Sequence, residues 1–520
     1  MTLSLVSKFI EENVKEAERQ YRKVVEYCKN TNTTFIDKDF PHTRRSYYSA
    51  RQEFLWFLEN LSISLYLSEK VTWTRPVLNP MISRDFHFKP WSVMDAPTPS
   101  EIVQRVLPDC GLIAALMSIA MHPEIVGALM PRKELSEYGV YQVRLCVDGE
   151  WKRILVDDWF PRFVVGLKGV FSNRNQLWPC LVEKAAAKLC GTYHALYGFD
   201  GGVAFQWITG APTTSYNWYV RPEIVANLWD ILHSSSLHAF PMTCGSQHVV
   251  LDEESSGICP GHMYSLLDAL EVDGLRLVRI RNTFGKLIWK GKWSPTWDGW
   301  TGREDLQQEL MMRTAWIDDS FWMEYDDFVK YFDQANVCRA RPEWFVTRMS
   351  LVVDGNEEQK PVKNVLKVTV ATSCDVAITA YRRGVRTTGR FPFITWVLIH
   401  SVKSDGEGPG ELVSRSVLSR NCTEDIRLTA GAYFILLTAL GTKRTHRNVA
   451  LHSSAPCKVE MVSMSRGQLA DSFQKLVLQY GHEMRLSRQD VSIKTYLSDD
   501  GSYMVIMAEN YTRDKFFHVQ

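Results

Sequence analysis

Three side chains far apart in the chain have the chemistry of a nucleophile and its base: Cys110, His262 and Asn282. Cys110 comes directly before a strongly apolar run, residues 111–120, that predicts a helix. A thiol in the first turn of a helix lies at the positive end of the helix dipole, which favours the thiolate nucleophile. A buried cysteine without chemical function is the alternative for any single cysteine, so the interpretation depends on the partners.

His262 and Asn282 are predicted to lie side by side on two neighbouring strands. His262 enters one apolar stretch, Asn282 ends the next, and Asp273-Gly274 between them predicts a turn. The histidine would accept the thiol proton while the asparagine amide holds the imidazole in its useful tautomer. The order Cys, His, Asn, with His262 following Cys110 by 152 positions, is that of papain-type proteases. Spacing alone is a weak signal, because the chain contains 13 histidines.

Over residues 40–344 the sequence resembles the calpain cysteine proteases, and the motifs occur in the family's order. They are Trp73-Thr-Arg-Pro76, Gln104 with Asp109-Cys110, Val156-Asp-Asp158, Gln176-Leu-Trp178, Leu181-Val-Glu-Lys-Ala185, Gly261-His262, Arg281-Asn282, Trp289-Lys-Gly291 and Phe321-Trp-Met323. Within the family the chain is most similar to the small-optic-lobes branch. That similarity rests on residues 139–146, 290–293 and 321–328.

The resemblance implies an α+β fold, with a two-lobed papain-like core followed by an all-β calpain-type (C2-like) sandwich. Cys110 would be the nucleophile on the first lobe, and His262 and Asn282 would lie on the second. Gln104, six residues before Cys110, matches the glutamine whose amide donates to the developing oxyanion. A solvated loop side chain is the alternative for Gln104.

Three departures from the family pattern lie close to these residues. The family's Gly-Asp-Cys-Trp reads Pro-Asp-Cys-Gly at residues 108–111, so Gly111 removes a large ring. The family's Asn-Pro-Trp-Gly reads Asn-Thr-Phe-Gly at residues 282–285, and Phe284 is expected to shield the His–Asn hydrogen bond less completely. Arg105 replaces a glycine. If these changes weaken the enzyme, restoring tryptophan at positions 111 and 284 is expected to raise activity.

Calcium is the cofactor that the resemblance implies, at two sites built from hard carboxylate oxygens. Glu101 and Glu183 match acidic ligands of the first-lobe site, although Glu183 could equally be a helix-surface carboxylate. In the second-lobe site only Asp318 remains as the main acidic match, because the other positions read Ile288, Pro295 and Ser320. Calcium dependence is therefore expected to be weak or to come through the first lobe alone. The sequence contains no EF-hand loop.

Composition limits the classes of partner and compartment. The 520 residues are 45% hydrophobic with a formal charge of +1, which does not favour nucleic-acid binding. The longest apolar run, residues 111–121, is about half of a membrane span, so no integral membrane segment is expected. The 11 cysteines form no C-x-x-C pair, which favours reduced thiols and the cytoplasm.

The elements that position these residues are predicted to form five segments. They are an N-terminal amphipathic helix and linker (1–47), the first protease lobe (48–214), the second lobe (215–344), the β-sandwich (345–464) and a partial C-terminal module (465–520). Residues 141–147 and 151–157, around Asp148-Gly149, predict a β-hairpin. Regularly spaced short strands after Met349 predict the sandwich. Basic pairs on it, 382–383 and 443–444, are read as solvated loop charges, with weak phospholipid or protein contact as the alternative.

The function predicted on this basis is a calcium-dependent-type cysteine endopeptidase that makes limited cleavages in protein substrates. A catalytically impaired calpain-like scaffold that acts through protein–protein binding is the main alternative, because fold does not guarantee activity. An acyl transferase built on the papain fold is a third interpretation.

Overall fold

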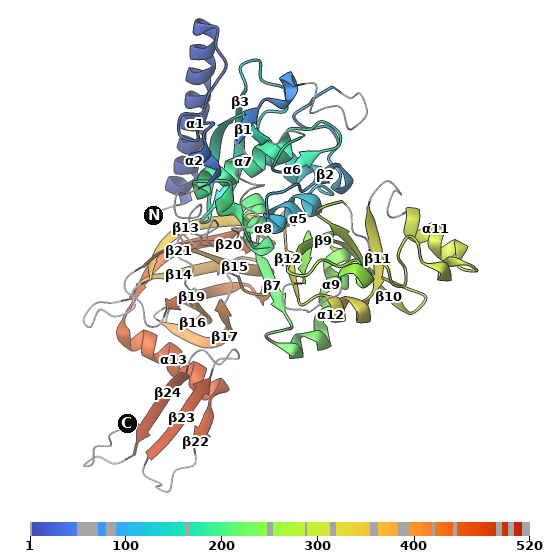
Figure 1. The fold of residues 1–520 in the computed structure, drawn as a ribbon. Coiled ribbons are helices and arrows are strands. Elements are labelled where there is room, and N and C mark those ends of the chain that lie inside the picture. Colours follow the sequence, from blue (N-terminus) through green and yellow to red (C-terminus); the bar gives the residue numbers. More distant parts are fainter. Residues whose placement is uncertain are drawn as a thin grey trace. The chain divides into compact units, whose positions relative to one another are not determined.

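The protein is described from a computed structural model, which covers residues 3–48, 71–79, 90–162, 166–246, 253–285, 289–312, 319–353, 362–382, 395–404, 406, 408–418, 422–439, 445–484, 491–497 and 504–511. Helices and antiparallel sheets are mixed, so the fold class is α+β (Figure 1). Contacts divide the chain into two compact units, residues 10–340 and residues 341–520 with residues 1–9.

The first part of the unit 10–340 surrounds one hydrophobic core. Its elements are α1 (Leu3–Thr31, which begins in the other unit), α2 (Arg44–Tyr47), β1 (Thr72–Thr74), β2 (Ile102–Val103), α5 (Cys110–Ile119), α6 (Pro123–Leu129), β3 (Val140–Val147), β4 (Glu150–Asp157), β5 (Phe160–Arg162), β6 (Phe171–Ser172), α7 (Trp178–Cys190) and α8 (Gly201–Thr209). Strands β3 and β4 form the predicted hairpin, and its turn residues Asp148 and Gly149 both have positive φ.

Helix α5 lies at the centre of this core, and all its residues from Gly111 to Ile119 are buried. A helix that is apolar on every side must be enclosed by protein, and α5 is covered by residues of α7, α8 and the β3–β4 hairpin. The apolar run ends as two helices because Pro123 starts α6.

The second part of the unit contains a six-stranded antiparallel sheet with its own hydrophobic core. The strand order is β11-β10-β9-β8-β12-β7. Helices α9 and α12 contribute Leu228, Leu232 and Phe328 to that core. The elements are β7 (Thr213–Asn217), α9 (Val225–Leu237), β8 (Met242–Gly245), α10 (Glu253–Ser256), β9 (Met263–Val272), β10 (Leu275–Asn282), α11 (Glu304–Met312), β11 (Ser320–Glu324), α12 (Tyr325–Tyr331) and β12 (Gln334–Cys338).

The unit that contains residues 341–520 is built mainly from two antiparallel sheets that share one hydrophobic core. The sheet β13-β20-β15-β18 and the sheet β17-β16-β19-β14-β21 both contribute side chains to it. The strands are β13 (Phe345–Val353), β14 (Val362–Val370), β15 (Cys374–Arg382), β16 (Thr395–Val402), β17 (Pro409–Leu418), β18 (Ile426–Leu428), β19 (Gly431–Ala439), β20 (Thr445–Ser453) and β21 (Cys457–Met464).

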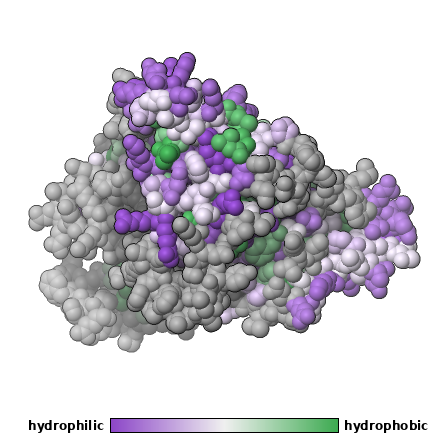
Figure 2. All heavy atoms as spheres, turned by 45° about the horizontal axis from the view of Figure 1, so that its top comes forward, coloured by the Kyte–Doolittle hydropathy of each residue, from purple (hydrophilic) through white to green (hydrophobic). Residues whose placement is uncertain are grey.

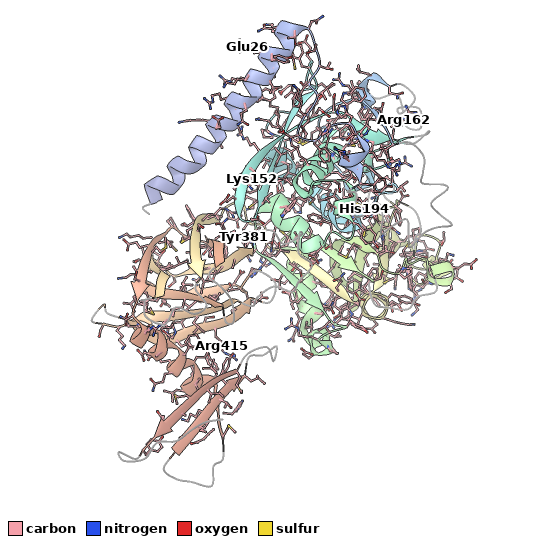
Figure 3. All side chains as sticks on the ribbon, turned by 60° about the vertical axis from the view of Figure 1, so that its left-hand side comes forward. Glu26, Lys152, Arg162, His194, Tyr381 and Arg415 are labelled. Carbon is pink, nitrogen blue, oxygen red and sulfur yellow. The ribbon has the colours of Figure 1, made fainter. Side chains whose placement is uncertain are left out.

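Helix α13 (Arg466–Tyr480) joins this pair of sheets to a small three-stranded sheet, β22 (His482–Met484), β23 (Val491–Leu497) and β24 (Met504–Asn510). A capping box between Ser465 and Gln468 starts the helix. Arg415 of β17, labelled in Figure 3, lies over the ring of Tyr480 at 4.3 Å and donates to the hydroxyl of Tyr496. Residues 516–520, whose sequence predicts a strand, lie outside the described residues.

Among the coloured residues on the face drawn in Figure 2, most are hydrophilic or intermediate, and the hydrophobic ones form small groups. None of the described helices combines the length and the apolarity that crossing a membrane requires.

Candidate active site

Cys110 is the first residue of α5 and is partly exposed, whereas the rest of the helix is buried. The desolvation of this position raises the pKa of the Cys110 thiol above its usual range. A hydrogen bond from the backbone N–H of Met263 opposes part of that rise. Since Met263 directly follows His262, the first residue of α5 lies beside the start of β9.

His262 and Asn282 come together because β9 and β10 form a hairpin that closes at Asp273-Gly274. His262 immediately precedes β9, Asn282 ends β10, and Asn282 pairs with Tyr264 in the sheet. The ring Nε2 of His262 lies 3.1 Å from the amide Oδ1 of Asn282. Both side chains are buried, and burial lowers the pKa of His262 to about 4.

Two aromatic rings enclose the imidazole of His262. Phe284 stacks on it with ring centres 4.5 Å apart and an angle of 16° between the planes. Tyr264 contacts it edge-on at 5.0 Å. The backbone N–H of Phe284 also donates to Asn282 Oδ1 at 3.0 Å. Phe284 therefore covers the histidine although it replaces a larger tryptophan ring.

Gln104 is buried and lies against the loop that carries Asn282. Its backbone N–H donates to the carbonyl of Thr283 at 2.8 Å, and its side-chain Oε1 accepts from the Thr283 hydroxyl at 2.5 Å. The amide Nε2 of Gln104 donates to the carbonyl of Leu107 at 2.7 Å, close to the start of α5. Gln104 thus does not behave as a solvated loop side chain.

Thr283 is a site residue whose contacts the sequence interpretation did not anticipate. Its Oγ1 lies 2.9 Å from His262 Nε2 as well as 2.5 Å from Gln104 Oε1. Cys259 is a second such residue, with its Sγ 3.8 Å from Asn282 Nδ2. The threonine was visible as a departure from the family's proline, whereas nothing in the sequence marked Cys259.

Direct hydrogen bonds connect the two hydrophobic cores around the site. The fully buried guanidinium of Arg281, next to Asn282, donates to the carbonyls of Ile102 at 3.0 Å and Ser100 at 3.3 Å. Ser265 of β9 donates to the carbonyl of Ala114 in α5 at 2.7 Å. These bonds fix the strands that carry His262 and Asn282 against the helix that begins at Cys110.

Gly111 has a structural reason for lacking a side chain. A Cβ atom at this position would lie 1.7 Å from the carbonyl oxygen of Phe199 and 3.1 Å from the backbone nitrogen of Gly201. The backbone of residues 199–201 therefore occupies the space that the family's ring would need. A tryptophan at position 111 would have to displace this backbone, which argues against the expectation that it raises activity.

The two first-lobe calcium candidates are buried and already engaged. Glu101 accepts from Gln176 Nε2 at 2.5 Å and from Trp178 Nε1 at 3.1 Å. Its burial raises the pKa of its carboxyl to about 8. Glu183 accepts from the backbone N–H of Val170 at 2.7 Å, and burial raises its pKa well above the usual range. Glu183 is not the helix-surface carboxylate that was the alternative.

The second-lobe candidates give little support for a cation. Asp318 and Ile288 lie outside the described residues. Ser320 accepts from the guanidinium Nε of Arg279 at 3.0 Å, so a positive charge already adjoins this position. Within the described part of the chain, no group of three His, Cys, Asp or Glu side chains is placed to hold a metal ion.

A thiol, an imidazole and two amides in one cluster are the groups that a thiol peptidase uses. The family model described as calpain family cysteine protease matches residues 35–339, more than half of the chain. The chain therefore belongs to the calpain family of cysteine proteases.

Individual relatives agree with the family assignment. Calpain-9 of Rattus norvegicus is 27% identical over 336 residues, which cover 62% of this chain and 45% of the relative. The calpain-1 catalytic subunit of Sus scrofa is 28% identical over 345 residues, or 64% and 46% of the two chains. The calpain-type cysteine protease DEK1 of Arabidopsis thaliana is 31% identical over 321 residues, or 59% and 14%.

The match thus spans less than half the length of these animal relatives and a seventh of the plant protein. The relatives are consistent with the narrower small-optic-lobes branch indicated by the motifs.

Proposed function

We propose that this chain is a cysteine endopeptidase that makes limited cleavages in protein substrates. Residues 48–214 and 215–344 would be the two lobes of a papain-like core, and residues 345–464 a C2-like sandwich. The N-terminal segment 1–47 and the partial module 465–520 would flank them. The two hydrophobic cores and the pair of sheets with a shared core support this division.

The chemistry would begin with transfer of the Cys110 thiol proton to His262. Nε2 of His262 faces the carbonyl-type oxygen of Asn282, so Nδ1 is the nitrogen left to act as base. The sulfur would attack the substrate carbonyl carbon, and the resulting oxyanion would accept from the Gln104 amide. His262 would then protonate the leaving amine, which leaves a Cys110 thioester that water hydrolyses with His262 again as base.

The observation that carries this proposal is the buried His262–Asn282 hydrogen bond located beside the N-terminus of α5, in a chain of the calpain family. The raised pKa of Cys110 and the lowered pKa of His262 favour a neutral thiol and imidazole at rest. Such a pair attacks less readily than a thiolate. This direction, together with the departures from the family pattern at residues 108–111 and 282–285, is consistent with the second candidate function, an impaired scaffold that binds protein partners.

We propose that calcium has at most a weak influence, through the first-lobe residues Glu101 and Glu183. A calcium ion would have to displace the N–H donors of both carboxyls, which are Gln176 and Trp178 at Glu101 and Val170 at Glu183. The two carboxyls as they stand therefore do not fit a ready calcium site. Asp318 stays a candidate for the second site.

We also propose a cytoplasmic location and protein substrates, with the sandwich as a surface for weak phospholipid or protein contact. The sequence supports a reducing compartment, because it has 11 cysteines in 520 residues and no C-x-x-C pair.

A thiol-directed peptidyl epoxide tests the enzymatic proposal. The wild-type protein and a Cys110→Ser variant are incubated with the epoxide, once with calcium and once with a chelator, and intact mass reports the adduct. Labelling that requires Cys110 supports the peptidase, and equal labelling in chelator supports independence from calcium. A protein that takes up no epoxide at Cys110 in either condition would contradict the peptidase and leave the scaffold.

A further inference from the structure

The hydroxyl of Thr283 lies between two groups to which the proposed reaction gives different tasks. Thr283 is fully buried. Its Oγ1 is 2.9 Å from Nε2 of His262, the proposed base, and 2.5 Å from Oε1 of Gln104, the proposed oxyanion donor. The backbone of the same residue also accepts from the N–H of Gln104 at 2.8 Å. One residue therefore contacts the oxyanion glutamine twice and the base once.

The direction of each hydrogen bond follows from its neighbours. Asn282 Oδ1 accepts from the backbone N–H of Phe284, so the atom facing His262 is an acceptor and His262 Nε2 carries the hydrogen. Thr283 Oγ1 then accepts from Nε2–H and has its own hydrogen available to donate. Gln104 Oε1 takes that hydrogen, because the amide nitrogen of Gln104 is directed to Leu107.

We propose that Thr283 is a positioning residue that couples His262 to Gln104; this inference rests on the proposed function of the site. The Thr283 hydroxyl accepts from the Nε2–H of the tautomer that Asn282 selects, and it fixes the orientation of the Gln104 amide. The family pattern that the chain resembles has proline at this position, which offers no hydroxyl. The coupling is therefore a property of this chain.

The coupling has a chemical consequence for the reaction. When His262 takes the Cys110 proton, its Nε2–H becomes a charge-assisted donor to Thr283. Hydrogen bonds in a chain polarise one another, so the bond from Thr283 to Gln104 Oε1 strengthens as well. A polarised amide is a better donor from its second hydrogen, at the moment when the substrate oxygen becomes negative. Thr283 keeps its own hydrogen throughout.

Two assays on the full chain separate the two contacts. Alkylation of Cys110 by iodoacetamide, followed by intact mass across a pH series, reports the thiol and His262 and needs no oxyanion donor. Hydrolysis of fluorescein-labelled denatured casein needs Gln104 in addition. The variants are Thr283→Val, which removes the hydroxyl at similar shape, Thr283→Ser, which keeps it, Gln104→Ala, and the double variant Thr283→Val with Gln104→Ala. Thr283→Ala serves if Thr283→Val does not fold, and thermal unfolding checks every variant.

The expected results are specific. Thr283→Val lowers kcat/KM about 10- to 100-fold, mainly through kcat, because it weakens an interaction that matters in the transition state. It also moves the acid-side midpoint of alkylation about half a pH unit lower, because the imidazolium loses an acceptor and the pKa of His262 falls. Thr283→Ser stays within about threefold of wild type in both assays, and the double variant within about threefold of Gln104→Ala alone. Gln104→Ala moves the alkylation midpoint in the same direction as Thr283→Val but by less, because Thr283 loses the acceptor that polarises its hydroxyl.

Several results would overturn the inference. The first is that Thr283→Val behaves like the wild type in both assays. The second is that folded Thr283→Ser loses hydrolysis as Thr283→Val does. The third is that the double variant loses as much activity as the product of the two single losses. The proposed function fails separately. If wild-type protein hydrolyses nothing but Thr283→Val still shifts the alkylation midpoint, the peptidase is wrong and the positioning of His262 by Thr283 stands. If wild-type protein hydrolyses nothing and Thr283→Val does not shift the alkylation midpoint, both the peptidase and the positioning role of Thr283 are wrong.

Discussion

Gly111→Ala tests whether the close approach of α5 to residues 199–201 requires a glycine. The added Cβ would lie 1.7 Å from the Phe199 carbonyl oxygen, whereas real Cβ atoms essentially never come closer than 3.0 Å. The backbones must therefore separate by about 1.3 Å inside a close-packed core. Overpacking of this kind costs about 3 kcal/mol. At roughly 2 °C per kcal/mol for a unit of this size, the unfolding temperature falls by about 6 °C.

The assay is thermal unfolding followed by intrinsic tryptophan fluorescence. Fifteen of the 17 tryptophans precede residue 341, so the signal reports mainly on the unit that contains α5. Gly127→Ala is the matched control, because Gly127 lies in helix α6 of the same unit and its Cβ would come no closer than 3.5 Å to another atom, the flexible end of Lys133. It should be neutral or slightly stabilising.

Gly111→Ala unfolding at the wild-type temperature would refute the reasoning. So would a gain of activity in Gly111→Trp, since the larger ring requires an even greater separation.

Three further predictions concern the site and the core beneath it. Phe284→Ala should lower the rate of Cys110-dependent peptide hydrolysis about tenfold, because the stacked ring no longer keeps water from the His262 hydrogen bond. This is part of the 10²–10⁴-fold rate enhancement that acid–base catalysis contributes. Phe284→Trp should hydrolyse substrate at least as fast as the wild type. Stability should fall by about 2 kcal/mol between pH 7 and pH 5 through His262, since the unfolded state binds a proton near pH 6.5 and the folded state only near pH 4. Denaturant unfolding at pH 7 and pH 5 should show that the free energy of unfolding falls less in His262→Gln than in the wild type. An equal fall in the two proteins would contradict this prediction. Lys184→Met should cost about 3–5 kcal/mol, because it leaves the fully buried partner Asp157 without its cation. Lys458→Met, at an exposed ion pair, should change the denaturation midpoint little.

The sequence predicted the parts of the site that depend on local patterns. Strand lengths and the turn at Asp273-Gly274 bring His262 and Asn282 to the same end of a hairpin, since an antiparallel pair closed by a tight turn has a fixed register. The start of α5 at Cys110 followed from the apolar run and its boundary. These features need only residues close together in sequence or paired in one hairpin.

The sequence did not predict contacts between distant segments. From the sequence, Gly111 was interpreted only as the loss of the family's tryptophan ring. In the structure, the carbonyl of Phe199, 88 positions away, occupies the space beside it. Thr283 was visible as an exception to a motif, but its bond to Gln104 spans 179 positions. Such contacts depend on how the two hydrophobic cores pack, and a single sequence carries no direct signal of that packing. The carboxyls of Glu101 and Glu183 matched metal ligands by position, yet burial and N–H donors determine their state.

The contacts between the cores bear on how this site is kept assembled. A metal ion that organises a site supplies positive charge to carbonyl and carboxylate oxygens. Arg281 supplies positive charge to the carbonyls of Ser100 and Ile102, and it is covalently part of β10, which ends at Asn282. A guanidinium is always protonated and cannot be chelated away. Two residues after Arg281 and Ile102, Thr283 and Gln104 are joined by two more hydrogen bonds. The proposed base and the proposed oxyanion donor are therefore held together by side chains and backbone of the chain itself. Weak dependence on calcium is then the expected property of the site, and Arg281, rather than Glu101 or Glu183, is the residue whose removal should separate its two halves.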